Sequence, residues 1–284
     1  MEKRIIARGV LVGAIGGLAA FVFARILAEP IIDRAIDYEG GRDAAHATLE
    51  AAAGHSTAGM EESELFTRSV QSTIGLGFGT VVFGAAMGAL FAVVYCLFMG
   101  RVGSLSPRNL ALCVAGGMFG VLYAVPFLKY PANPPSIGNP DTIGQRTGLY
   151  LSMVAIAAVC AVGAVWLGRK LQARLGNWTA TIAAGLAFVV VVTAIAALLP
   201  ALGHLAANRA LGDAATETPG PLIDSSGRIV YPGFPADDLY YFRFYSLAAQ
   251  VILWSVIGVG FATLAPRLFR HADESAAAAP AAAV

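Results

Sequence analysis

Residues 73–99, TIGLGFGTVVFGAAMGALFAVVYCLFM, contain no charged side chain. A helix rises about 1.5 Å per residue, so this run is long enough to cross a hydrocarbon layer about 30 Å thick. Inside that layer the backbone has no water to bind, and a helix satisfies its own N–H and C=O groups. The stretch therefore predicts a transmembrane helix.

Five further apolar runs of similar length flank it. Only the first is interrupted by charge, at Arg25, which lies close enough to one end to reach the interface. The six predicted spans are about 9–28, 73–99, 109–128, 148–168, 179–202 and 246–266. Hydrophobic residues make up 57% of the chain and charged residues only 13%, against about 25% in soluble domains. The pattern excludes a soluble domain and predicts an all-α fold, a polytopic membrane helix bundle with about six transmembrane helices.

The first apolar run also has features of a secretory signal peptide, because Lys3, Arg4 and Arg8 precede it. No A-x-A cleavage pattern follows the run, where Ala28 is succeeded by Glu29 and Pro30. We therefore favour an uncleaved helix. Cleavage would leave five spans and the same topology elsewhere.

Basic residues set the orientation, because cytoplasmic loops carry an excess of Lys and Arg. With the N-terminus inside, the short inner segments carry Lys3, Arg4, Arg8, Arg101, Arg108, Arg169, Lys170, Arg174, Arg267 and Arg270. The long outer loops, 29–72, 129–147 and 203–245, hold fewer basic residues and most of the acidic ones. The sequence thus predicts a multi-pass protein of the cell inner (plasma) membrane with both termini cytoplasmic.

The spans and their loops form one predicted bundle domain over residues 1–270. The Ala/Pro-rich tail, 271–284, is expected to be disordered. Four proline residues stiffen the outer segment 129–140, KYPANPPSIGNP. This stiffness predicts a lid or a fixed strap over the bundle.

Glycine residues four apart recur in the predicted spans and favour close helix packing, although they also suit the lining of a narrow path. The pairs are Gly13/Gly17, Gly75/Gly79, Gly84/Gly88 and Gly116/Gly120.

No constellation of catalytic residues is present. The chain lacks G-x-S-x-G, H-E-x-x-H and P-loop motifs, and its predicted spans contain no carboxylate. The cysteines Cys96, Cys113 and Cys160 all fall in apolar runs without CxxC spacing, which favours small buried hydrophobic residues. We therefore expect no enzyme activity. The net charge of +1 carries no information about nucleic acid, and we expect no nucleic-acid partner.

The first outer loop contains the strongest candidate site. The alanine-rich segment 42–53, RDAAHATLEAAA, predicts a helix after Gly40 and Gly41. Asp43, His46 and Glu50 are spaced three and four apart, so they lie on one face of that helix. An imidazole flanked by carboxylates suits a borderline divalent metal such as cobalt, nickel or zinc, and His55 follows closely. The alternative is a solvated polar face with incidental histidine residues.

The chain resembles the CbtA family, a proposed cobalt-transporter subunit of bacteria. The resemblance rests on RILAEPIIDRAIDYEG at 25–40, ESELFTRSVQSTIGLGFGTVVFGAAMGALFAVVY at 62–95, FRFYSLAAQVILWSVIGVGFATL at 242–264 and FLKYPANPPSIGNPDTIGQRT at 127–147. It implies a permease subunit for cobalt uptake, linked to cobalamin synthesis and paired with a small single-span, His-rich membrane subunit.

Two functions from different classes remain open. One is a permease subunit that takes up a divalent transition metal, cobalt by the resemblance, as transported cargo and with no permanently bound cofactor. The other is a non-transporting membrane scaffold or assembly protein that binds a partner through its outer loops. A homo-oligomer is compatible with either function.

Overall fold

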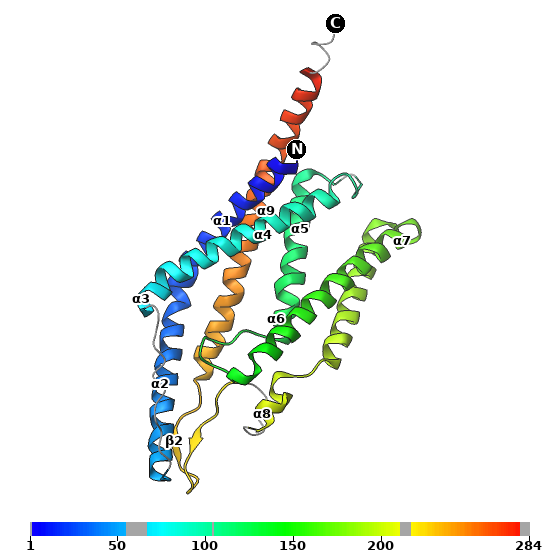
Figure 1. The fold of residues 1–284 in the computed structure, drawn as a ribbon. Coiled ribbons are helices and arrows are strands. Elements are labelled where there is room, and N and C mark those ends of the chain that lie inside the picture. The colour runs from blue at the N-terminus through cyan, green and yellow to red at the C-terminus, as the bar shows by residue number, and fades with distance from the viewer. Residues whose placement is uncertain (1, 55–66, 104, 211–216, 279–284) are drawn as a thin grey trace. The chain divides into compact units, whose positions relative to one another are not determined.

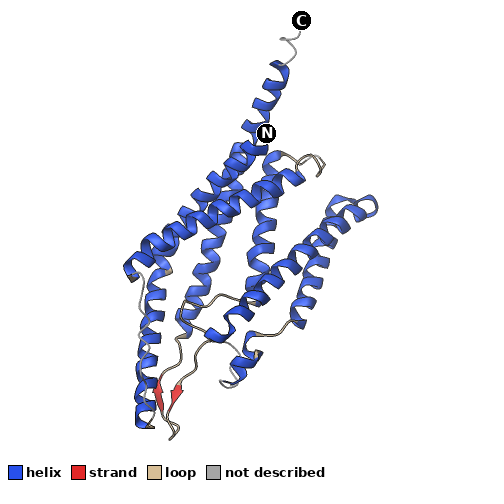
Figure 2. Ribbon diagram, in the orientation of Figure 1, coloured by secondary structure: helices blue, strands red, loops and turns tan. Residues whose placement is uncertain are grey.

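The computed structural model describes residues 2–54, 67–103, 105–210 and 217–278. Helices dominate this part of the chain, with one small antiparallel hairpin, which confirms the all-α prediction (Figures 1 and 2). The elements are α1 (Glu2–Leu27), α2 (Glu29–Ala52), α3 (Arg68–Val70), η1 (Gln71–Gly75), α4 (Leu76–Phe98), α5 (Pro107–Phe119), η2 (Gly120–Ala124), α6 (Val125–Lys129), η3 (Pro140–Thr142), α7 (Ile143–Leu198), η4 (Leu202–His204), α8 (Ala206–Ala210), β1 (Leu222–Ile223), β2 (Ile229–Tyr231) and α9 (Ala236–Ala278).

Five helical segments are long and apolar enough to cross a membrane. They are Glu2–Leu27, Arg68–Phe98, Pro107–Lys129, Pro140–His204 and Ala236–Ala265. Their agreement with the predicted spans confirms a polytopic helical membrane protein.

The fourth segment is 65 residues long, about three times what one crossing needs. Gly176 interrupts it with φ 73° and ψ 169°, a conformation that ends a helix. The two arms of α7 lie side by side (Figure 1), and a Cβ placed on Gly168 would sit 3.4 Å from the Cβ of Ala184. With α7 counted as two arms, the chain offers the six passes that the sequence predicts.

The chain divides into two compact units, each assembled from separate stretches of sequence. The first contains residues 1–30, 62–119 and 245–284, and the second contains 31–61 and 120–244. The single bundle domain over residues 1–270 stays a prediction.

Glycine residues bring α1 and α4 into backbone contact within the first unit. A Cβ on Gly13 would overlap the carbonyl oxygen of Gly84, and one on Gly88 would overlap that of Gly9. Gly17 lies against the backbone of Thr80 in the same way. The predicted packing role is therefore confirmed for two of the four glycine pairs, Gly13/Gly17 and Gly84/Gly88.

Within the described ranges, the other two glycine pairs do not pack against a neighbouring helix. Gly79, Gly116 and Gly120 have no atom within 4 Å of an added Cβ, and the nearest atom to one on Gly75 is the Val70 carbonyl at 3.6 Å.

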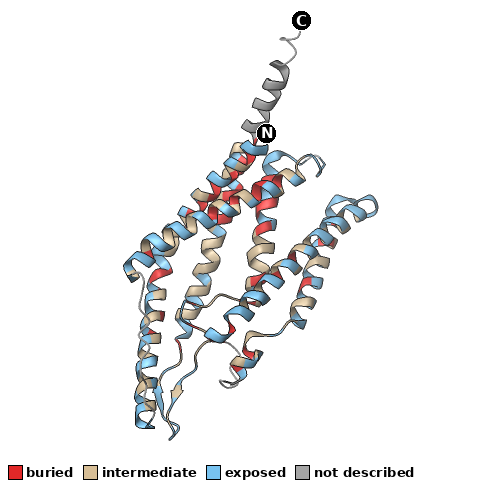
Figure 3. Cartoon of the chain, in the orientation of Figure 1, coloured by how far each residue is buried: buried red, intermediate tan, exposed pale blue. Residues whose placement is uncertain are grey.

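Aromatic rings join α9 to α4 in the first unit. Phe261 lies edge-on to Phe91 and Tyr95, with ring centroids 5.1 and 4.9 Å away. Leu253 and Ile257 are buried on the same helix. Buried residues gather where α1, α4, α5 and α9 meet (Figure 3), while many large apolar side chains stay exposed, as lipid-facing surfaces require.

Three expectations need correction or extension. The helix predicted at 42–53 begins at Glu29 and ends at Ala52, so Gly40 and Gly41 do not break it. Pro30 lies in its first turn, where a missing N–H costs nothing. None of the three cysteines is buried, and Cys113 is exposed. Helix α9 reaches Ala278, inside the tail 271–284.

Candidate functional site

Helix α2 carries three of the four predicted metal ligands. Asp43 and His46 are exposed and Glu50 is half-buried. The His46 Nδ1 atom lies 3.4 Å from a carboxylate oxygen of Glu50. The structure therefore brings His46 and Glu50 together, while His55 lies outside the described residues.

The continuity of α2 adds a residue that the sequence pattern alone did not include. Because the helix runs through Gly40 and Gly41, Glu39 lies four residues before Asp43 on the same helical face. The spacing of Glu39, Asp43, His46 and Glu50 is thus four, three and four. Among the described residues, no three His, Cys, Asp or Glu side chains are grouped closely enough to hold a metal ion. The metal site stays a prediction.

Hydrophobic packing holds the N-terminal half of α2 against other parts of the second unit. Ala35 and Tyr38 form a buried cluster with Ile137 and Phe234. The Tyr38 ring meets the Phe234 ring edge-on at 5.1 Å. Burial raises the pKa of Tyr38, whose hydroxyl donates to the Pro232 carbonyl at 2.9 Å.

Polar contacts fix α2 along its length. Arg42 donates to the Gly220 carbonyl at 2.7 Å. Arg34 forms a 2.6 Å ion pair with Asp238, and this hydrogen bond raises the pKa of the guanidinium. Gly41 leaves room for the Tyr231 hydroxyl, which a Cβ would overlap. The helix that presents the candidate ligands is consequently attached at several points.

The proline-rich segment 129–140 is a fixed strap within the second unit. Tyr130 donates to the Pro200 carbonyl at 2.9 Å, and burial raises the pKa of this phenol. Arg243 donates to the Ala132 carbonyl and to the Asn133 side chain, at 3.1 and 2.8 Å. With Ile137 buried as well, these contacts favour the strap over the lid.

A buried polar cluster, which the sequence analysis did not identify, lies next to the strap. The Glu217 side chain is fully buried and forms a 2.8 Å ion pair with Arg146. Its other oxygen accepts hydrogen bonds from Thr142 at 2.5 Å and from Asn208 at 2.9 Å. Asn139 in turn donates to Asn208 at 2.9 Å. Glu217 is therefore held as a carboxylate by two hydrogen bonds to its Oε1 atom and by the Arg146 cation beside its Oε2 atom, which accepts no hydrogen bond from the described residues.

A second buried carboxylate belongs to the first unit. Glu29, at the start of α2, is 2% exposed and forms an ion pair with Arg68 of α3. The pair links the end of α1 to the segment that leads into α4. Because the two charges pair with each other, we interpret the contact as structural.

Several long apolar helices with ionic groups gathered in their connections define an integral membrane protein of the multi-span class. The chain belongs to the CbtA family, whose model, described as "Probable cobalt transporter subunit (CbtA)", matches residues 2–266. This match confirms the resemblance and supports a transporter role, and the word subunit implies a partner. No curated protein and no solved structure matches the chain.

Proposed function

We propose that the chain is a permease subunit for uptake of a divalent transition metal, cobalt in particular, in the plasma membrane. The observation that carries the proposal is the family match over residues 2–266, which covers every apolar segment of the chain. The metal is the transported cargo and no cofactor is permanently bound.

The proposed capture site is the exposed face of α2 that carries Asp43, His46 and Glu50, with His55 contributing from the same outer loop. The approach of His46 to Glu50 supports it, as does the position of Glu39 one turn before Asp43. Imidazole and carboxylate ligands suit cobalt. Ligands on an exposed helix bind loosely, and a transporter must release its ion as well as bind it.

The excess of basic residues in the segments predicted to be inside supports the proposed topology, with both termini cytoplasmic and α2 on the outer side. The proposed partner is a small single-span, His-rich membrane subunit, and a homo-oligomer of the chain is compatible with it.

Reconstituted vesicles test the transport function. The chain, purified with any polypeptide that stays bound to it, is placed in liposomes that contain a cobalt-sensitive dye. A permease gives a dye response that depends on external cobalt and exceeds that of empty vesicles. A response equal to that of empty vesicles contradicts the proposal and favours a scaffold or assembly protein.

Side-chain removal on α2 tests the capture site separately. The triple change Asp43→Ala, His46→Ala and Glu50→Ala should reduce uptake at limiting cobalt by about tenfold or more, on the scale of losses at metal sites. Asp37→Ala is the matched control for Asp43→Ala, because Asp37 is also exposed but lies away from that face. Unchanged uptake in the triple variant would show that the site is wrong even if transport is real.

A further inference from the structure

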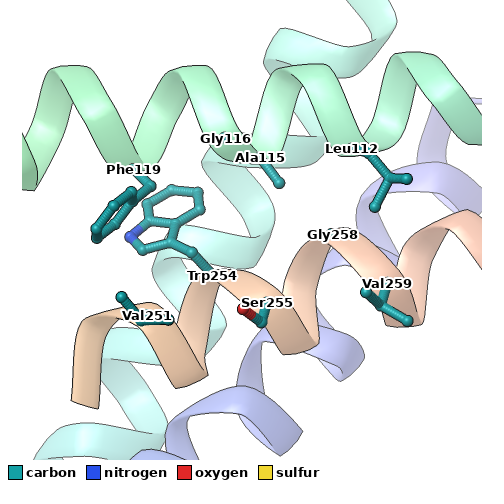
Figure 4. Close-up of a pocket in the computed structure, with 9 residues that line it drawn as sticks. All are labelled: Leu112, Ala115, Gly116, Phe119, Val251, Trp254, Ser255, Gly258 and Val259. Carbon is teal, nitrogen blue, oxygen red and sulfur yellow. The ribbon is translucent and has the colours of Figure 1, made fainter. Parts of the chain in front are cut away.

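An apolar groove runs between α5 and α9 in the membrane-crossing part of the first unit (Figure 4). Its volume is about 230 Å³. The lining residues are Leu112, Ala115, Gly116, Phe119, Val251, Trp254, Ser255, Gly258 and Val259. Because both helices lie in apolar segments, the surroundings of the groove are lipid or another membrane-embedded chain.

Two hydrogen-bond donors in this groove have no acceptor among the described residues. Trp254 is only 4% exposed, yet its indole N–H donates to no described atom, and neither does the hydroxyl of Ser255. Other hydroxyls of the apolar helices behave differently. Thr80 and Ser152 donate to the carbonyl four residues earlier, and Thr263 to the one three residues earlier.

Both donors lie near the middle of the apolar segment of α9, where lipid supplies no acceptor. An unpaired polar group in hydrocarbon is costly, so a lipid chain would leave both donors unsatisfied. A protein helix supplies carbonyl oxygens or hydroxyls. The chemistry of the groove therefore favours a protein occupant over lipid.

One glycine residue of the groove also suits a helix. Among the described residues, no atom lies within 4 Å of a Cβ added to Gly116, so its backbone is open to a close approach. Gly258 differs, because α5 already packs against it and an added Cβ would stand 2.9 Å from Ala115. Small residues of this kind allow helices in lipid to pack at short range.

We propose that the groove binds a transmembrane helix of a second, different subunit, which places small residues in it and accepts hydrogen bonds from Trp254 and Ser255. A two-fold pairing of this chain would place one concave groove opposite another and fill neither. The family description calls the protein a subunit, which implies that it binds a partner polypeptide. The inference rests on that description and not on the cargo, so its test is independent of metal transport.

The test uses the full-length chain, tagged at its C-terminus and expressed in its own host. Native mass spectrometry in detergent measures what stays bound. We expect a complex with a second polypeptide, and we expect Gly116→Leu to reduce its occupancy about tenfold by filling the groove. Gly117→Leu is the matched control: Gly117 is the next residue on α5, has equal space around it and does not line the groove. Ser255→Ala should weaken the complex about threefold.

Photo-crosslinking identifies the occupant. Val259, which is 57% exposed at the groove, is replaced by p-benzoylphenylalanine. The expected product is a crosslink to an apolar stretch of about 20 residues in a different polypeptide. Adducts to lipid alone, to this chain itself or to a second copy of it would overturn the proposal. So would equal occupancy in the Gly116→Leu and Gly117→Leu variants.

Discussion

At the scale of single residues, the contact between α1 and α4 depends on glycine, which has only a hydrogen atom where other residues have a Cβ. An alanine at position 88 would overlap the Gly9 carbonyl and stand 2.8 Å from the Gly13 Cα. Both obstacles are backbone atoms, which move only if the helices separate. Gly88→Ala should therefore lower the free energy of unfolding by about 1–3 kcal/mol, measured by thermal unfolding in detergent.

Gly79→Ala is the control for that change, because Gly79 belongs to the same helix and an added Cβ there meets nothing within 4 Å. It should leave stability unchanged or raise it by up to about 1 kcal/mol, since alanine favours a helix over glycine. If both variants unfold alike, the α1–α4 contact is wrong.

The sequence alone could not rank these glycine positions. Spacing of four places two glycine residues on one helical face, and that holds equally for Gly84/Gly88 and for Gly116/Gly120. Which face meets another helix depends on long-range packing. Only the first of these pairs lies against a second backbone, whereas the other leaves its face open.

Asp224 gives a residue-scale prediction about pH. Its carboxylate accepts hydrogen bonds from the Ser226 hydroxyl, foremost, and from the Arg228 and Ser226 backbone N–H groups, which lower its pKa from 3.8 to about 2. A lowered pKa in the folded state means that the hairpin loop is fully stabilised above about pH 4 and loses this contribution as the pH falls toward 2. The protection of the Ser226 amide against hydrogen exchange, measured relative to the intrinsic exchange rate at the same pH, should fall across that interval.

Asp224→Asn serves as the comparison. An asparagine side chain is uncharged throughout, so the protection of the same amide, relative to the intrinsic exchange rate, should show no fall specific to this interval. A wild-type profile without a change between about pH 4 and 2 would contradict the role of the carboxylate.

At the scale of elements, α7 depends on Gly176 to reverse direction. With φ 73° and ψ 169°, this residue occupies a region that only glycine adopts readily. Gly176→Ala should therefore cost about 1–3 kcal/mol of stability. The pairing of the two arms is measured by disulfide formation between Gly168→Cys and Ala184→Cys, which lie within van der Waals reach.

Gly163→Ala is the matched control within α7, because Gly163 has a helical backbone and open space around it. It should keep the crosslink yield of the parent protein. Equal yields in the Gly163→Ala and Gly176→Ala backgrounds would show that the turn does not depend on glycine.

The sequence predicted the positions of apolar helices better than the start of the polar helix α2. Apolar runs predicted the spans, because apolar residues are what the hydrocarbon layer accommodates. Helix α2 begins thirteen residues before the predicted position 42, because the change of polarity at Glu29 marks the end of an apolar run and does not show that a polar helix follows. Its buried face, which includes Ala35 and Tyr38, is determined by packing against residues about 100 and 200 positions later, and local propensity does not report that.

The Glu217 cluster connects distant elements and gives a prediction of its own. Arg146→Met would leave a fully buried carboxylate without its cation and should cost about 3–5 kcal/mol. Adding Glu217→Gln removes the charge while keeping an acceptor for Thr142 and Asn208, so the double variant should recover most of the loss. Heat stability in detergent measures both. A double variant no more stable than Arg146→Met would contradict a charge-based explanation.

At the scale of the whole molecule, the site was less predictable than the fold. The face with Asp43, His46 and Glu50 follows from helical spacing, and the structure places two of these side chains together. The Glu217 cluster gathers residues separated by up to 78 positions, from 139 to 217, without periodic spacing. No local pattern marks such a set, and none could have identified it.

The parity of membrane crossings gives the last prediction, which decides whether α7 crosses the membrane twice or once. Between Arg108 and Ser225 the chain contains the segment Pro107–Lys129 and the two arms of α7. Three crossings place these residues on opposite sides, whereas an undivided α7 would give two crossings and the same side. In a variant without native cysteines, a membrane-impermeant maleimide should label Ser225→Cys in intact cells and Arg108→Cys only after permeabilisation. Both positions are exposed, so burial does not limit labelling. Labelling of both from outside would show that the reversal at Gly176 is wrong, and labelling of Arg108→Cys alone would invert the proposed orientation.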